Sequence, residues 1–292
     1  MEEPQEKIVL APADRRPAVL DLINGARTRL SLSLFRCDDQ QVLDALGAAV
    51  QRGVHVRALI TTRAKGSKKQ LEKLDRFLTE IGTDVRRYSD PVVRYHAKYM
   101  VADDGPALVA SLNFTEKCLE RTCDFMVITS DREVSGELLH LFDSDWNGTA
   151  YVPRPSAGDR IIVGPEHARR RFAVLLESAV RRIRIIDPKM DDPAMLALVR
   201  ARAASGVAVE LRGPDAVGDL VAHGKLLIVD DATAVIGSIS LSMMALEFRR
   251  ELAVVSRERQ TLSQLDLFWR SLPPVATDGA ANLESDGLAP LA

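Results

Sequence analysis

The sequence predicts an α/β protein of two pseudo-symmetric lobes, each a mixed, mostly parallel sheet flanked by helices. Three observations support this: an internal repeat, alternating strand and helix patterns in each copy, and a chain of 292 residues with 46% hydrophobic residues. This length suits two units of about 150 residues, each with its own core. We expect a first lobe over 1–152 and a second over 153–272. A disordered tail over 273–292 should follow, because it lacks apolar periodicity.

The repeat follows two constant offsets. In the early part of each copy, equivalent residues lie 153 positions apart, as do Gly53 and Gly206. In the later part the offset is 127, as between His96 and His223. The first copy therefore holds about 26 residues, between about 61 and 95, that the second copy lacks.

Each copy shows the same order of local patterns. A proline, Pro17 or Pro165, stands near the start of an amphipathic helix. A strand over 30–34 or 183–186 follows, and then an Asp-rich turn, a second helix and another strand. The paired Asp residues in these turns resemble helix N-caps. Strands joined by helices imply crossover connections and a sheet covered on both faces.

The later part of each copy contains an HxKxxxxD pattern, formed by His96, Lys98 and Asp103 and by His223, Lys225 and Asp230. On a strand, residues i and i+2 point to the same face, so each His emerges beside its Lys. Lysine neutralises charge on phosphoryl oxygens. Histidine can attack phosphorus when neutral, or donate a proton when charged. Two such pairs supply both roles around one phosphate.

These patterns resemble the phospholipase D superfamily, whose mark is HxKxxxxD followed by GSxN. The resemblance covers nearly the whole chain, from about residue 8 to 272. The first motif continues with Ser111 and Asn113, but has Ala110 where Gly is usual. The second keeps Gly237 and Ser238, but has Ser240 where Asn is usual. The resemblance therefore implies two phospholipase D-like lobes, packed with one active site between them.

The resemblance also implies a metal-independent phosphodiesterase that works through a phosphohistidine and needs no cofactor. It assigns His96 as nucleophile and His223 as acid and base. Lys98, Lys225 and Asn113 would hold the phosphate, and Ser111, Ser238 and Ser240 are further expected substrate contacts. The family also places a carboxylate downstream that orients each His. Asp124 and Glu251, each 28 residues after the His of its own copy, fit this role.

Asp103 and Asp230 complete the two catalytic motifs. Each stands five residues past its Lys, which is an odd spacing. On a strand that spacing turns the side chain off the catalytic face, or carries it beyond the strand end. A structural role is the expectation for both.

Composition restricts the remaining possibilities. The net charge of −2 and the pI near 6.2 give no basic footprint for nucleic acid. The chain has no apolar run of the length that spans a membrane, and its acidic start predicts no signal peptide. We expect a cytoplasmic protein, peripheral at the membrane. Three cysteines without a CxxC pair indicate free thiols, and the other histidines, His55, His140 and His167, suit structural roles.

Three functions remain open on sequence grounds: an enzyme acting on phospholipids at a membrane surface, a nuclease with the same chemistry, and a binding module with a decayed site. The extra segment of the first copy, between about 61 and 95, contains a run of basic residues. They would either bind anionic groups or form the solvated face of a helix: Arg63, Lys65, Lys68, Lys69, Lys73 and Arg76. Both half-sites lie in one chain, so a monomer suffices for the chemistry.

Overall fold

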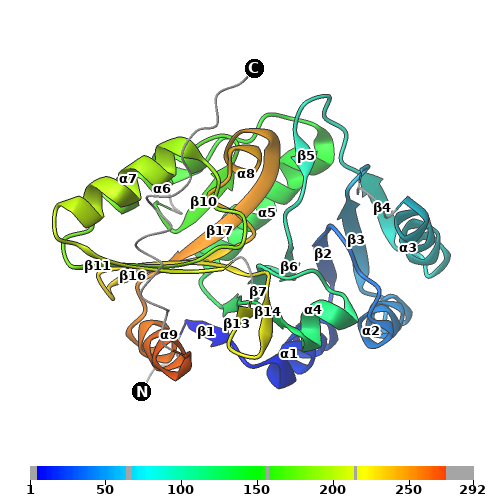
Figure 1. The fold of residues 1–292 in the computed structure, drawn as a ribbon. Coiled ribbons are helices and arrows are strands. Elements are labelled where there is room, and N and C mark those ends of the chain that lie inside the picture. Colours follow the sequence, from blue (N-terminus) through cyan, green and yellow to red (C-terminus); the bar gives the residue numbers. More distant parts are fainter. Residues whose placement is uncertain (1–4, 64–67, 156–157, 214–215, 274–292) are drawn as a thin grey trace.

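The computed structural model describes residues 5–63, 68–155, 158–213 and 216–273. It shows two α/β lobes packed against each other (Figure 1). The expected tail lies outside the described residues except for Pro273. No described helix is long and apolar enough to cross a membrane.

The first lobe contains a seven-stranded sheet in the order β1-β9-β7-β6-β2-β3-β4. Its elements are β1 (Glu6–Val9), α1 (Pro12–Gly25), β2 (Arg29–Leu34), α2 (Gln40–Gln51), β3 (His55–Ile60), α3 (Lys68–Glu80), β4 (Asp84–Arg87), β5 (Arg94–Tyr95), β6 (Tyr99–Ala102), β7 (Ala107–Ala110), α4 (Glu116–Glu120), β8 (Thr122–Cys123), β9 (Met126–Thr129) and α5 (Arg132–Asn147).

The second lobe contains a sheet in the order β10-β17-β16-β15-β11-β12, which β5 joins by pairing with β17. Its elements are β10 (Ile161–Gly164), α6 (Ala168–Glu177), β11 (Arg182–Ile186), α7 (Pro193–Ala204), β12 (Ala208–Arg212), β13 (Ala216–Val217), β14 (Leu220–Ala222), β15 (Lys225–Val229), β16 (Thr233–Gly237), α8 (Met243–Phe248), β17 (Arg249–Ser256) and α9 (Arg259–Ser271).

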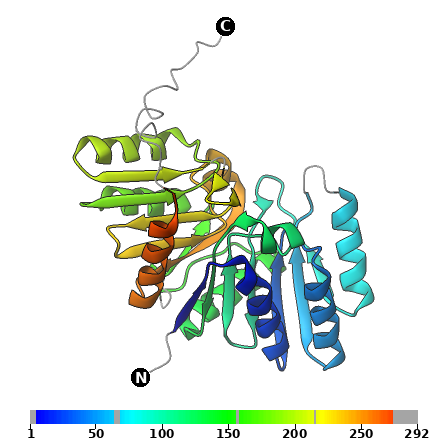
Figure 2. The same cartoon turned by 60° about the horizontal axis from the view of Figure 1, so that its bottom comes forward.

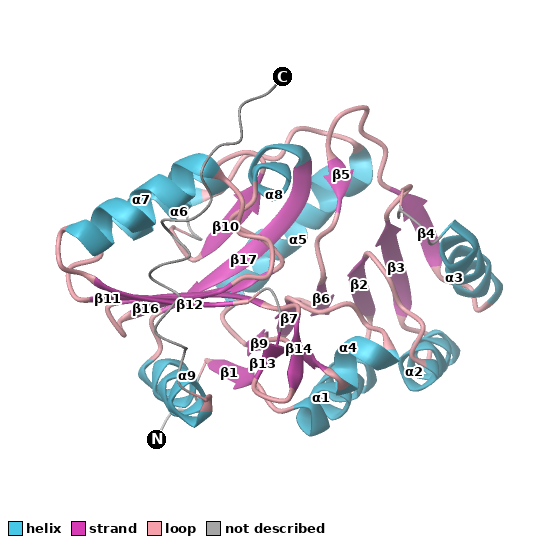
Figure 3. Cartoon of the chain, viewed as in Figure 1, coloured by secondary structure: helices cyan, strands magenta, loops and turns pink. Residues whose placement is uncertain are grey.

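The two-lobed α/β class and the mixed sheets are confirmed (Figure 3). The expected predominance of parallel pairing was wrong. Within the first sheet only β2 with β3 and β3 with β4 pair in parallel, and within the second only β11 with β12 and β5 with β17. Two of the antiparallel pairs, β6–β7 and β15–β16, have a local cause, because a short turn joins the two strands of each.

Equivalent tertiary contacts recur at the two offsets. Asp39 caps α2 and pairs with Arg16, and Asp192 caps α7 and pairs with Arg169. The predicted N-caps are thus present at the second Asp of each pair. The guanidinium of Arg16 also binds Glu120 of α4, as that of Arg169 binds Glu247 of α8. Each first helix is therefore anchored to the same two elements of its lobe.

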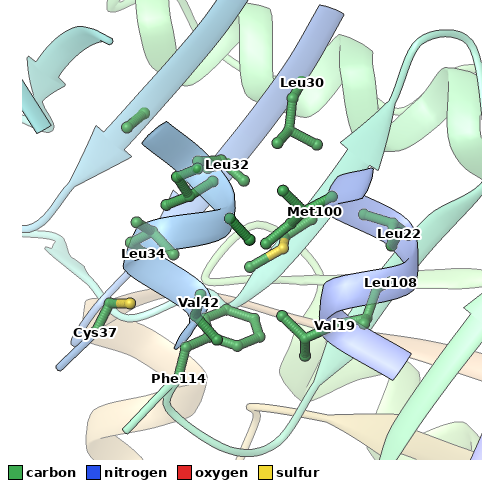
Figure 4. Packing of buried hydrophobic residues seen from close by; sticks show 14 of the residues in the cluster. Val19, Leu22, Leu30, Leu32, Leu34, Cys37, Val42, Met100, Leu108 and Phe114 are labelled. Atoms are coloured by element: carbon green, nitrogen blue, oxygen red, sulfur yellow. The ribbon is translucent and has the colours of Figure 1, made fainter. Parts of the chain in front are cut away.

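Apolar residues form a core within each lobe and further cores between them. Figure 4 shows Leu30, Leu32 and Leu34 of β2 packed against α1 and α2. A shared core joins the two sheets through residues such as Val109 and Val254, with α5 beside them. A second shared core includes Phe125 and Trp269 of α9. The lobes lie together in Figure 2 because this apolar surface is buried between them.

Two short strands cross from one lobe to the other. Strand β5 pairs in parallel with the start of β17, and β14 pairs in parallel with β8. These pairings occupy equivalent positions in the two copies. In each pair, one strand leads directly into an HxK segment, and its partner strand leads into or carries a downstream carboxylate. The exchange brings both motifs to the seam between the lobes.

Candidate active site

Each HxK segment is held by the backbone of the opposite lobe. The His96 N–H donates to the Arg250 carbonyl at 2.9 Å, directly after the β5–β17 pairing. In the other half, the Gly224 N–H donates to the Cys123 carbonyl at 2.7 Å, directly after the β14–β8 pairing. Both histidines are therefore fixed by strands that belong to different lobes.

The orienting carboxylates are exchanged between the lobes. The Nδ1 atom of His96 lies 2.8 Å from Glu251 Oε1, and the Nδ1 atom of His223 lies 3.0 Å from both oxygens of Asp124. The sequence placed each carboxylate 28 residues after the His of its own copy. In the structure each one meets the His of the other copy. A carboxylate on Nδ1 fixes the ring tautomer and leaves Nε2 for chemistry.

The serines of the two motifs support these carboxylates. Ser111 Oγ donates to Asp124 Oδ1 at 2.6 Å, and it accepts the Phe125 N–H at 2.9 Å. Ser238 accepts the Leu252 N–H at 3.3 Å. Burial raises the pKa of the adjacent Glu251, and the Ser238 hydroxyl, after Lys98, Lys225 and Arg249, opposes that shift. Both serines are buried. They lie behind the carboxylates, in a position that differs from the expected substrate contact.

Thr122 is a supporting residue that the sequence analysis missed. Its hydroxyl donates to Asp124 Oδ2 at 2.5 Å. At the equivalent position of the second copy stands Arg249, whose Nη1 lies 3.5 Å from Glu251 Oε1. The residue two places before each carboxylate therefore contacts it in both halves. One half uses a neutral donor and the other a cation.

The two motif lysines converge on the same region. Lys98 Nζ contacts both the carbonyl and, at 3.0 Å, the Nδ1 of His96, and Lys225 Nζ donates to the His223 carbonyl at 2.6 Å. Both side chains are buried. Burial lowers the pKa of Lys98 well below its ordinary value, and the nearby Lys225 adds to this effect. Two ammonium groups held close together favour an anion between them.

The histidines differ in their electrostatic environment. Burial lowers the pKa of His96 well below 6.5, and Lys98, Arg249 and Lys225 lower it further. Burial also lowers the pKa of His223, but there Asp124 opposes the shift. The unliganded site therefore favours a neutral His96 and makes His223 the easier of the two to protonate.

Asn113 and Ser240 occupy equivalent positions but behave differently. Asn113 is buried, and within the described part of the chain its Oδ1 has no hydrogen-bond partner. Ser240 donates to Asp187, with distances of 2.8 and 3.0 Å to the two carboxylate oxygens. The Ser240 hydroxyl is thus occupied by a buried carboxylate, which corrects its expected role as a substrate contact. Asn113 lines a pocket and stays available.

One pocket opens beside His223, and a second lies beside Arg249, the residue that contacts Glu251. One has a volume of about 430 Å³ and is lined by Phe35, Leu71, Leu74, Asn113, Val221 and His223, among others. The other measures about 550 Å³, and its wall includes Asp187, Lys189, Met190, Asp191, Met244 and Arg249. The pockets use several equivalent positions of the two copies. The first has an apolar wall from α3, and the second carries more cations.

Asp103 and Asp230 lie at strand ends and bind backbone. Asp103 accepts the N–H groups of Arg27, Thr28 and Arg29 at 2.8–3.1 Å, and Asp230 accepts those of 180–182 at 2.7–3.0 Å. Both have positive φ angles, 52° and 54°, a conformation that Asp tolerates better than most residues. These contacts give the motif aspartates a structural role, as their spacing predicted.

Replacing Asp103 with alanine should lower the free energy of unfolding by about 1–2 kcal/mol, because several donors lose a charged but solvent-screened acceptor. Burial alone would raise the pKa of Asp103, but the hydrogen bonds outweigh it and bring the pKa to about 2. Because the pKa is lower in the folded protein, the ionised carboxylate stabilises the fold at pH values above the pKa of the unfolded chain. This stabilisation is lost as pH falls towards 2. Urea unfolding at pH 7 and pH 2.5 measures this. A deficit of equal size at both pH values would contradict it.

The remaining sequence candidates lie apart from the histidine pair. His55 contacts Asp84, His140 contacts the Val152 carbonyl, and His167 accepts the Val163 N–H. The three cysteines are free and buried, as expected. Of the basic residues in the first copy's extra segment, those described are exposed, and Lys65 lies outside the described residues. The apolar face of that segment lines the first pocket through Leu71 and Leu74.

One group in the described chain has donor atoms spaced for a metal ion: Cys118, Asp124 and His223, all within 4.8 Å of one another. The oxygens of Asp124 already accept hydrogen bonds from Ser111 and Thr122 and lie against His223. The arrangement therefore fits an orienting carboxylate better than a metal ligand.

Comparisons with known proteins agree with this geometry. A family model described as cardiolipin synthase, PLD-like domain, matches residues 19–146. Cardiolipin synthase A of Pseudomonas aeruginosa is 29% identical over 151 residues, which cover 48% of this chain and 29% of that protein. Human mitochondrial cardiolipin hydrolase is 30% identical over 149 residues, or 48% of this chain and 56% of that protein. The matched segment thus spans only part of either relative.

Two solved structures share the fold across almost the whole chain. Polyphosphate kinase from Porphyromonas gingivalis has a TM-score of 0.74 at 16% identity, over 90% of this chain and 46% of that one. Phosphatidylserine synthase from Haemophilus influenzae has a TM-score of 0.71 at 14% identity, over 91% and 85%. The protein is therefore a two-lobed α/β protein with a phospholipase D-like domain. Residues 19–146 match that domain, which confirms the motif resemblance to the phospholipase D superfamily.

Proposed function

We propose that the protein is a metal-independent phosphodiesterase that cleaves or transfers the phosphatidyl group of a phospholipid through a phosphohistidine. In the first step, neutral His96 attacks phosphorus through Nε2 and the bond to the leaving alcohol breaks. His223 donates a proton to that alcohol. In the second step His223 takes a proton from water or another alcohol, whose oxygen attacks phosphorus and breaks the P–N bond.

Each role follows from a contact in the site. Glu251 and Asp124 hold the two rings by Nδ1, so that Nε2 is the reactive nitrogen in both. Lys98 and Lys225 stabilise charge on the non-bridging oxygens, and Asn113 supplies a further polar contact. His223 lines the first pocket, which makes this pocket the place for the leaving alcohol. An anionic phosphate would raise the lowered pKa of His223 and favour its protonated form.

The observation that carries the lipid assignment is an apolar rim on α8, which the equivalent described helix α4 of the first lobe lacks. On α8, Met243 is 50% exposed, and Met244 and Phe248 are each 38% exposed. Met244 lines the second pocket together with Arg249, which directly follows Phe248. At equivalent positions the first lobe has Glu116, Lys117 and Arg121, which are exposed and charged. Exposed apolar side chains beside a phosphate site suit a substrate held in a lipid surface.

The direct test is cleavage of phospholipid in the presence of EDTA. Vesicles of phosphatidylcholine, phosphatidylethanolamine and phosphatidylglycerol are incubated with the protein, and phosphatidic acid and transfer products are measured. We expect product from the native chain and none from a His96→Ala variant. Cleavage of DNA or RNA with no action on any of these lipids would overturn the lipid assignment.

Changing Met243 and Phe248 to serine should raise the KM for vesicle-bound substrate about tenfold, because apolar contact with the bilayer is lost. Hydrolysis of a soluble diester such as bis(p-nitrophenyl) phosphate should stay within about twofold of native, since neither side chain touches the histidines. Glu116→Ser with Arg121→Ser, at the equivalent positions of α4, is the matched control. Equal losses on both substrates would argue against an interfacial role.

The pH dependence of kcat/KM should be shifted to acid. The free enzyme needs a neutral His96 and a protonated His223, and the pKa of each is lowered, first by burial. Activity should therefore decline as pH rises through the lowered pKa of His223, so that the maximum lies below pH 6.5. An Asp124→Asn variant loses the charge that raises this pKa, and its alkaline limb should move to still lower pH. A native alkaline limb above pH 7 would contradict the assigned roles.

A further inference from the structure

Arg15 of α1 is a buried cation whose guanidinium binds backbone carbonyls in place of a carboxylate. Its Nη1 atom donates to the carbonyls of Cys118 at 3.0 Å and Thr122 at 2.7 Å, and its Nη2 atom donates to those of Leu10 at 3.0 Å and Asp124 at 2.9 Å. The side chain is fully buried, and within the described chain no carboxylate oxygen contacts it. A buried charge is costly unless hydrogen bonds and an opposite charge compensate it. The four carbonyls supply the hydrogen bonds, and an opposite charge is needed nearby.

That opposite charge is the carboxylate of Asp124, which orients His223. Burial lowers the pKa of Arg15, and the charge of Asp124 is the largest effect that opposes this shift. The two residues are also linked through Thr122, whose carbonyl binds Arg15 and whose hydroxyl donates to Asp124 Oδ2 at 2.5 Å. Arg15 therefore holds three carbonyls of the segment 118–124, which leads from α4 (Figure 1) through β8 to the orienting carboxylate.

The second copy is built without this cation. The residue 153 positions after Arg15 is Ala168. The carbonyls of Ala245 and Arg249 are equivalent to two of those that Arg15 binds, and the backbone of Gly164 approaches them. A Cβ atom added to that glycine would lie 3.2 Å from the first carbonyl oxygen and 3.1 Å from the second. Backbone thus packs against these carbonyls in one copy, where a guanidinium binds them in the other. Because a lobe of this fold forms without the arginine, the fold alone does not account for Arg15.

We propose that Arg15 is a positioning residue for the acid and base step: it fixes the segment 118–124 and so keeps the Asp124 carboxylate aimed at Nδ1 of His223. This inference rests on the proposed function, because it names a residue that acts through Asp124 on the proposed acid and base. Without the guanidinium, the carboxylate loses its fixed backbone, and the His223 ring is no longer held in one tautomer. Attack by His96 uses the carboxylate of the other copy and should proceed as before.

The kinetic test uses bis(p-nitrophenyl) phosphate and the full chain in EDTA. The burst of p-nitrophenolate counts the chains in which His96 attacks phosphorus, and the steady rate after it reports the second step, which needs His223. In Arg15→Met the burst rate should stay within about twofold of native, while the steady rate per burst site falls about tenfold. Arg15→Lys keeps the charge but binds fewer carbonyls. It should lose only about threefold, and it keeps the test open if Arg15→Met does not fold.

Arg184→Met is the matched control for the loss of a buried guanidinium. Arg184 lies on β11 of the second lobe and pairs with Asp266 at 2.9 Å. Its replacement should lower the number of burst sites through stability and leave the steady rate per site native. If Arg15 served only the fold, Arg15→Met would behave in the same way, and that result would overturn the proposal.

A second arm needs no substrate. Nitrogen-15 NMR of the histidine-labelled chain at pH 8 reports the tautomer of His223, whose signals are those missing from His223→Ala. We expect the proton on Nδ1 alone in the native chain and a mixture of both tautomers in Arg15→Met. A native tautomer in Arg15→Met would also overturn the proposal. A changed tautomer in a chain that cleaves no diester would instead overturn the proposed function and leave the positioning of Asp124 by Arg15 standing.

Discussion

A His96→Ala variant is expected to lose at least about 10⁴-fold in turnover of any phosphodiester, because it removes the group that forms the covalent bond to phosphorus. His223→Ala should cost a similar factor with phospholipids, whose alcohol leaves only when protonated. Single-turnover measurements on the native chain and both variants give these factors. The melting temperatures should change little, since neither imidazole fills a core position.

The activities of the two variants should differ when the leaving group needs no proton. With bis(p-nitrophenyl) phosphate, His223→Ala should still release one p-nitrophenolate per protein in a burst and then stall, since water is no longer activated. His96→Ala should show no burst. A burst from His96→Ala and none from His223→Ala would exchange the two roles, and bursts from both would rule out either His as the sole nucleophile.

The second large effect is expected for folding, at Gly237. A Cβ atom placed there would lie 2.3 Å from the Leu252 carbonyl oxygen and 2.5 Å from Ala253 Cα, both backbone atoms of the neighbouring strand β17. Because that strand also carries Glu251 to His96, it cannot shift without disturbing the site. Gly237→Ala should therefore lower the free energy of unfolding by about 3 kcal/mol, and urea unfolding measures this.

The repeat supplies a matched control for that substitution. Alanine already stands at the equivalent position of the first copy, Ala110, where it is buried in β7. Ala110→Gly should cost only about 1 kcal/mol, through chain entropy and a lost methyl contact. A Gly237→Ala protein as stable as native would show that the close approach of β16 to β17 is not rigid.

Much of the fold could be predicted because the chain repeats itself. Two offsets aligned the copies, and the Asp residues at helix starts marked caps that the structure contains at Asp39 and Asp192. The direction of strand pairing was harder to predict, because the sequence does not show which strands are neighbours in a sheet; the Asp-Gly-Pro turn at 104–106 does mark a hairpin, whereas the turn at 230–232 carries little turn signature. The two turns make β6–β7 and β15–β16 antiparallel.

The residue types of the site could be predicted, but their partners could not. Spacing along the chain places Asp124 near the first motif, whereas the β14–β8 pairing carries His223 to it from the other lobe. Nothing in the sequence records which strands cross the seam. Ser240 illustrates a second limit, since its position in the motif suggested a phosphate contact while a buried Asp187, 53 residues away, takes its hydroxyl. Such choices depend on which polar groups packing buries together.

The central claim is that phosphorus becomes bonded to His96, with no metal required. The most direct measurement is rapid acid-free quenching of a reaction with bis(p-nitrophenyl) phosphate in EDTA, followed by peptide mass spectrometry at high pH, where phosphohistidine persists. We expect a phosphoryl adduct on the peptide containing His96, accumulating in His223→Ala and absent from His96→Ala. Turnover in EDTA with no adduct on either histidine would contradict the account.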